Sequence, residues 1–210
     1  MQTVYIFING IRAFPGDSRG WTDRAVTWTH LNTAHRAEKF EYFTTATFRR
    51  LYLNWWAAEL AHLVVRYRRA NHKVVLVGHS NGCEVIVRAL SKIHDRVEEV
   101  HLISPACDSD FCRTELNCRM HDERLGRICV YRGGSDWAMT CAKITSIPLR
   151  LLGLGYGYLG LTGPIGVAQA CRDRVEELVE PDFGHSTWFN EEAFDRTMQL
   201  VTQTIKEDLP

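Results

Sequence analysis

Six consecutive residues, Gly78-His79-Ser80-Asn81-Gly82-Cys83, have the types and spacing that nucleophilic catalysis needs. They follow the apolar run 73–77, which predicts a buried strand, and precede 84–90, which predicts a helix. A serine at the apex of such a turn has a strained backbone and a hydroxyl pushed out of the sheet. The chain passes so close on either side that Gly78 and Gly82 leave no room for a side chain. The following helix aims its amides at a developing oxyanion, so Ser80 is predicted to be a nucleophile.

Alternating strands and helices must position this serine. The hydrophobic pattern predicts strands at 3–8, 39–45, 73–77, 97–103, 127–132 and 175–179. It predicts helices at 47–70, 81–94 and 110–125, with a long loop over 11–30. A last helix is predicted to begin after the cap residue Asn190, with a buried stripe of Phe194, Met198, Val201 and Ile205. This alternation indicates a parallel sheet of six strands covered on both faces.

Length and composition are those of an ordinary globular protein. A chain of 210 residues fits one domain, 1–210, with a full-sized core. The formal net charge of +0 gives no indication of a nucleic-acid partner. The first residues lack the basic region of a signal peptide, and seven cysteines, an odd number, are typical of reduced thiols. We therefore expect a cytoplasmic location.

The turn at 78–82, a nucleophile elbow between a strand and a helix, resembles that of the α/β-hydrolase superfamily. The order of the predicted elements resembles that superfamily over nearly the whole chain. The resemblance implies a three-layer α/β-hydrolase fold with a mostly parallel sheet of about six strands. It implies that the first two family strands are lacking, as in compact lipases and cutinase-like esterases. It further implies a serine hydrolase that cleaves a carboxylic ester, with a hydrophobic acyl group, through an acyl-enzyme and without a cofactor or metal.

The resemblance also implies a triad in the order serine, acid, histidine. His185 is the one histidine after Asp136, and it lies between the last predicted strand and the last predicted helix, so it is expected to be the base. Asp136 follows the strand 127–132 and is expected to be the acid. Asp108 and Asp110, which follow the preceding strand, are the alternatives.

The remaining site residues follow from the same resemblance. The oxyanion hole is expected to use the backbone amides of Asn81 and Ile11, because the segment 7–11 resembles the turn after the family's corresponding strand, with Asn9 in place of histidine. Trp137 follows the expected acid and Trp188 follows the expected base. Either tryptophan is a candidate for the wall of an acyl pocket, and either is a candidate for the core.

The segment 151–171 contains no charged residue and has six glycines. We expect it to form an apolar cap over the site, in which Leu154 and Leu159 contact the acyl group. A membrane-inserted hairpin and a buried connection are the alternatives. The expected partner is a small-molecule acyl ester, and contact with a lipid surface would occur through this segment.

Other functions stay open on the sequence. The same triad serves thioesterases and amidases. An esterase of the SGNH type would use Ser18 in Gly16-Asp17-Ser18, with Asp182 to His185 as its closing D-x-x-H. A non-catalytic binding module on this scaffold is a third alternative. The cluster Cys107, Cys112, Cys118 and His121 could nominate zinc, but its spacing lacks a C-x-x-C pair.

Overall fold

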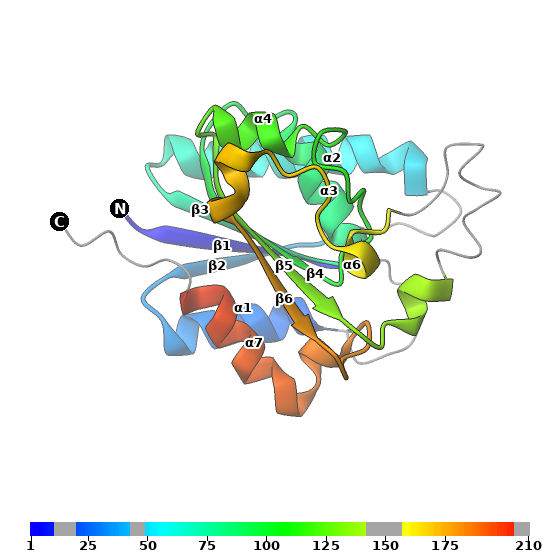
Figure 1. Ribbon diagram of the computed structural model, residues 1–210. Helices are drawn as coiled ribbons and strands as arrows, with labels where there is room; N and C mark the ends of the chain where they lie inside the picture. The colour runs from blue at the N-terminus through cyan, green and yellow to red at the C-terminus, as the bar shows by residue number, and fades with distance from the viewer. Residues whose placement is uncertain (11–19, 43–48, 142–156, 204–210) are drawn as a thin grey trace.

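A single sheet forms the centre of the molecule (Figure 1). The computed structural model describes residues 1–10, 20–42, 49–141 and 157–203. Within them lie six strands: β1 (Thr3–Ile8), β2 (Arg36–Phe40), β3 (Lys73–His79), β4 (Val97–Ile103), β5 (Leu125–Gly133) and β6 (Val175–Glu180). Their order is β2-β1-β3-β4-β5-β6, and each neighbouring pair is parallel. The carboxyl ends of β3, β5 and β6 therefore meet at one edge of the sheet.

Helices cover both faces of this sheet, which gives three layers. In Figure 1, α1 and α7 lie on one side, and α2, α3 and α4 lie on the other. The bounds are α1 (Trp21–Asn32), α2 (Arg49–Arg69), α3 (Asn81–Leu90), α4 (Leu116–His121), α6 (Leu159–Thr162) and α7 (Glu191–Gln203). Two short 3₁₀ helices, η1 (Gln169–Arg174) and η2 (Thr187–Phe189), precede β6 and α7. The predicted fold class is thus confirmed, with all neighbouring strands parallel.

Successive side chains along a strand point to opposite faces of the sheet, and each face has its own hydrophobic core. On β1, Val4, Ile6 and Ile8 face the side of α2 and α3, while Tyr5 and Phe7 face the side of α1 and α7. A strand covered on both faces is mostly apolar, and the runs 4–8 in β1 and 74–77 in β3 have this pattern, whereas β4 also buries Glu99 and His101. Edge strand β2 differs, because it pairs with β1 alone and has the polar sequence 36–40. Its predicted start at 39 was three residues too late for that reason.

Helix α1 corrects the prediction of a loop over 11–30. Three residues at helical spacing, Trp21, Ala25 and Thr29, are buried on the side of the sheet that carries Phe7. Trp21 packs edge-on against Phe7, with ring centroids 5.9 Å apart, and stacks on Phe189 at 4.4 Å. The threonines and the interrupted apolar pattern of this segment give it a weak intrinsic preference for a helix. The helix forms because the tertiary packing of its buried residues stabilises it.

Helix α4 is much shorter than the predicted helix over 110–125. The side chain of Asp108 accepts a hydrogen bond from the amide of Asp110, and that of Asp110 accepts one from the amide of Cys112. Such local turns compete with the helical hydrogen bonds. Glu115, directly before α4, has a left-handed backbone with φ of 61°. The helix therefore begins only at Leu116.

The expected cap segment 151–171 is described from Gly157 onward, and Leu154 lies outside the described residues. From Gly157 the chain packs against the loop after β4: the amide of Leu159 donates to the carbonyl of Cys107 at 3.1 Å, and that of Gly160 donates to Pro105 at 2.9 Å. Leu159 is 0% exposed and belongs to the core beside α3. The expectation that Leu159 contacts a substrate is therefore corrected, since its side chain lies inside the protein.

Candidate active site

Ser80 occupies a strained backbone position between β3 and α3. Its φ of 54° and ψ of −120° lie in a region that side chains rarely adopt. Three hydrogen bonds hold the peptide units on either side of it. The Ser80 amide donates to the carbonyl of Ile103 at 3.0 Å, and the Ser80 carbonyl accepts from the amides of Cys83 at 3.2 Å and Ala106 at 3.1 Å. The predicted turn thus has the geometry that presents a serine side chain at the edge of the sheet.

Glycines allow the chain to pass close to this serine. A Cβ atom on Gly82 would lie 2.5 Å from the carbonyl oxygen of Asn9, and one on Gly78 would lie 2.6 Å from Cδ1 of Ile86. Position 82 is therefore closed to a side chain, because it would meet backbone, whereas a side chain at position 78 would force the Ile86 side chain to shift. Gly10, in the loop after β1, lies so near that its Cβ would be 3.1 Å from Cβ of Ser80. Gly10 therefore flanks the serine directly.

Asp136 and His185 meet across neighbouring strand ends. Nδ1–H of His185 donates to Oδ2 of Asp136 at 2.8 Å, and the Asp136 side chain is fully buried. Oδ1 of the same carboxylate accepts from the amide of Met139 at 2.9 Å and so caps the helix that begins at residue 137. The carboxylate is thereby fixed. Because Nδ1 carries the proton toward Asp136, Nε2 of His185 is free to accept one.

His185, the expected base, lies beside the strand that leads to Ser80, the expected nucleophile. The rings of His79 and His185 have centroids 4.9 Å apart, and Nε2 of His79 lies 3.0 Å from the backbone oxygen of His185. In the described part of the chain, no hydrogen bond joins the Ser80 hydroxyl to the His185 ring. Without substrate, the hydrogen bond between nucleophile and base is often long, and it tightens when substrate binds. The structure therefore brings Ser80, His185 and Asp136 to one edge of the sheet.

Asn81 is the first residue of α3, so its amide is one of those that the helix leaves unpaired. Its buried side chain donates from Nδ2 to the hydroxyl of Tyr42 at 3.0 Å. This contact joins residues 39 apart, and no local sequence signal indicated it. Ile11, the other expected oxyanion donor, lies outside the described residues.

The two candidate pocket tryptophans have opposite environments. Trp137 is 73% exposed beside Asp136, so it can touch a bound molecule. Trp188 is 1% exposed and packs edge-on against Phe183 and Tyr131, with ring centroids 4.8 Å and 5.7 Å away. Trp188 is thus a core residue here, and of its two predicted roles the structure shows the core one.

The alternative catalytic residues are not brought to His185. The carboxylates of Asp108 and Asp110 hold local turns, and Asp110 also pairs with Arg113. Ser18 lies outside the described residues. Among the described residues, no three histidine, cysteine or carboxylate side chains gather as metal ligands would. Nor is any described helix long and apolar enough to cross a bilayer.

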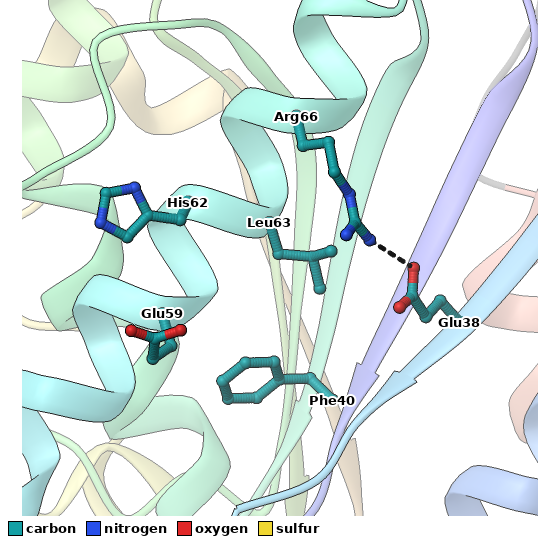
Figure 2. A pocket seen from close by; sticks show the side chains of 6 residues that line it. All are labelled: Glu38, Phe40, Glu59, His62, Leu63 and Arg66. Carbon is teal, nitrogen blue, oxygen red and sulfur yellow. Dashed lines mark ion pairs between the residues drawn. The ribbon is translucent and has the colours of Figure 1, made fainter.

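An open groove of about 370 Å³ lies between the edge strand β2 and helix α2 (Figure 2). Its lining residues come from β2 and α2: Glu38, Phe40, Glu59, His62, Leu63 and Arg66. Arg66 reaches across it to pair with Glu38 at 3.6 Å. Ser80, Asp136 and His185 are not among the residues that line this groove.

Comparison with known proteins places the chain among hydrolases. The sequence profile of the family described as serine hydrolase matches residues 19–124. No curated protein matches the sequence. Solved structures match nearly the whole chain, at identities so low that they show the fold alone. One is a candidate hydrolase of the α/β superfamily from Xanthomonas campestris, with 14% identity and a TM-score of 0.57, covering 97% of this chain and 100% of the other.

Two further structures have the same architecture. A candidate hydrolase from Agrobacterium vitis is 18% identical, with a TM-score of 0.57, and the match covers 95% of this chain and 87% of that one. A thermophilic esterase from Thermogutta terrifontis is 13% identical, with a TM-score of 0.51, and the match covers 96% and 88% of the two chains. The open six-stranded sheet is therefore that of the α/β-hydrolases.

Proposed function

This chain belongs to the serine hydrolase family, and on that premise we propose that it hydrolyses carboxylic esters through an acyl-enzyme formed on Ser80. The observation that carries the proposal is the 2.8 Å hydrogen bond between His185 and Asp136, at the edge of the sheet where the strained turn holds Ser80. This hydrogen bond keeps the proton on Nδ1 of His185, so that Nε2 can act as a base toward Ser80.

The first half-reaction uses these groups in sequence. Nε2 of His185 takes the proton from the Ser80 hydroxyl as Oγ attacks the ester carbonyl carbon. The carbonyl oxygen becomes an oxyanion, which the Asn81 amide at the start of α3 stabilises. The carbon–oxygen bond of the ester then breaks, and His185 gives its proton to the departing alkoxide. Asp136 stabilises the imidazolium that exists in between.

Water completes the cycle. His185 removes a proton from a water molecule that attacks the acyl-enzyme, and the proton returns to Oγ of Ser80 as the carboxylic acid leaves. No cofactor enters either half-reaction as proposed. Exposed Trp137, beside the acid, offers an apolar surface to a hydrophobic acyl group. One structure with this fold is described as an esterase, which makes an ester the first substrate class to test.

Hydrolysis of nitrophenyl esters of increasing acyl length tests the proposal. We expect measurable turnover, and we expect Ser80→Ala to lower kcat by at least about a thousandfold, because no acyl-enzyme can form without the hydroxyl. Ser91→Ala, at the far end of α3, is the matched control and should keep full activity. Thioester and anilide analogues of the best ester separate the related reactions. If no substrate is turned over by the folded protein, the chain is a binding module and the proposal is wrong.

A further inference from the structure

We propose that His79 is a positioning residue, which holds the backbone of His185 and so sets the distance between base and nucleophile. The inference rests on the proposed function, in which His185 acts on Ser80. His79 itself has no part in that reaction scheme. Its place is unusual, because it directly precedes the nucleophile and its side chain binds the residue that carries the base.

One hydrogen bond makes this connection. Nε2 of His79 lies 3.0 Å from the carbonyl oxygen of His185, and the two residues are 106 positions apart. A carbonyl oxygen only accepts, so Nε2 of His79 carries the proton and donates. The contact ties the end of β3 to the loop after β6. Any movement of this loop relative to the elbow would have to break it.

The His79 ring is held firmly enough to act as such a tie. It is 3% exposed. The rings of Trp21 and Phe189 meet it edge-on, with centroids 6.4 Å and 4.9 Å away. Gly10 closes another side, since a Cβ there would lie 3.4 Å from Nδ1 of His79. The ring is thus packed between α1, η2 and the loop after β1, and its hydrogen bond has a fixed direction.

The chemistry of this position also fits a neutral donor. Burial, together with the neighbouring His185, lowers the pKa of His79 to about 3. His79 therefore stays uncharged while His185 becomes an imidazolium 4.9 Å away in the proposed reaction. A lysine or arginine here would donate equally well but would repel that cation. A neutral imidazole combines the donor with the flat shape that the packing requires.

Two substitutions separate the donor from the ring. His79→Phe keeps the flat ring and removes the donor, whereas His79→Gln keeps an N–H donor and removes the ring. We expect kcat of His79→Phe for a nitrophenyl ester to fall about 10- to 100-fold with KM within about threefold, because a small misplacement of a catalytic group has effects of this size. His79→Gln should recover kcat to within about fivefold of the wild type.

Thr197→Val is the matched control. It removes another buried hydrogen bond, from Oγ1 of Thr197 to the carbonyl of Ala193 in α7, at nearly constant volume. It should lower the melting temperature and leave kcat unchanged. If folded His79→Phe has wild-type kcat, the inference is wrong. If folded His79→Gln loses about 10-fold or more in kcat relative to the wild type, the donor does not sustain activity and the inference is wrong again. This result does not depend on whether His79→Phe folds.

A spectroscopic measurement distinguishes failure of the inference from failure of the proposed function. The Nδ1 proton of His185, hydrogen-bonded to buried Asp136, can be followed by proton NMR and assigned by its loss in His185→Ala. In His79→Phe this resonance should broaden or disappear, whereas in His79→Gln and Thr197→Val it should persist. An unchanged resonance in His79→Phe overturns the inference, whether or not the wild-type protein hydrolyses esters.

Discussion

The elbow at Ser80 and the segment 157–171 both contact the loop that follows β4. The amide of Ala106 donates to the carbonyl of Ser80 at 3.1 Å, and the carbonyl of Ala106 accepts from the amide of Gly157 at 3.2 Å. Both regions are rich in glycine, and both use it for close approach. A Cβ on Gly82 would collide with Asn9, and one on Gly157 would overlap the backbone of Cys107.

The difference lies in what the glycines surround. In the elbow they flank a serine with a φ of 54°, a strained backbone that presents the serine side chain at the end of the sheet. In the segment 157–171 they flank Leu159, which is fully buried. The glycines of this apolar segment therefore allow close packing around Leu159, whereas the sequence had suggested a movable cap. A glycine-rich segment therefore indicates a reactive side chain when its glycines flank a polar residue with a strained backbone, as they do at Ser80. The two regions should respond to substitution in opposite ways.

On the catalytic side, we expect Asp136→Asn to lower kcat about 10³- to 10⁴-fold, because an amide no longer stabilises the protonated His185 or its useful tautomer. Its stability should change little, since asparagine can still cap the helix through the amide of Met139. Steady-state kinetics and a thermal melt measure both effects. Asp108→Asn is the control with near-normal kcat. Near-normal turnover of Asp136→Asn would instead move the acid to Asp108 or Asp110.

On the packing side, we expect Leu159→Ser to lower the free energy of unfolding by about 3 kcal/mol, through lost burial and a cavity. The folded fraction should keep kcat and the preference for acyl length. Urea unfolding and the ester series measure these quantities. Leu161→Ser, at a half-buried position in the same helix, should have a smaller effect. Unchanged stability with a weaker preference for long acyl chains would restore the cap interpretation.

A smaller effect concerns acid stability near the elbow. The pKa of His79 is lowered from 6.5 to about 3 in the folded protein, so the unfolded chain binds this proton more readily. Its contribution to stability is therefore fully present above pH 6.5 and is lost as the pH falls toward 3. At pH 5 the loss is roughly 2 kcal/mol. Urea unfolding at pH 7 and pH 5 should show a steeper decline for the wild type than for His79→Gln. Equal declines would contradict this account of the buried ring.

Signals that lie within a few residues were sufficient to predict the elbow and the cap of α7. Asn190 does accept the amide of Ala193 at 2.8 Å, as its place before the acidic first turn indicated. The pairing of Asp136 with His185 was expected from the resemblance to the α/β-hydrolases, and both residues do follow the carboxyl ends of the neighbouring strands β5 and β6. The elbow and the cap needed no knowledge of tertiary packing.

Contacts between distant segments could not be predicted in the same way. Helix α1 forms because Trp21 packs on Phe7 and Phe189, and a weak local pattern does not reveal such partners. The hydrogen bond from Asn81 to Tyr42 and the hydrogen bond from His79 to His185 each depend on how two segments far apart in the sequence meet. Local turns at Asp108 and Asp110 likewise shortened α4 through side chains that the hydrophobic pattern ignores.

The identity of the nucleophile is tested most directly by mapping the site of fluorophosphonate attachment. Such a reagent forms a stable covalent adduct with the serine that its neighbouring base activates. Peptide mass spectrometry of the labelled protein should place a single adduct on Ser80, and His185→Ala should abolish it while the protein stays folded. An adduct on Ser18 with Ser80 untouched, or an equal rate of labelling in His185→Ala, would contradict the account.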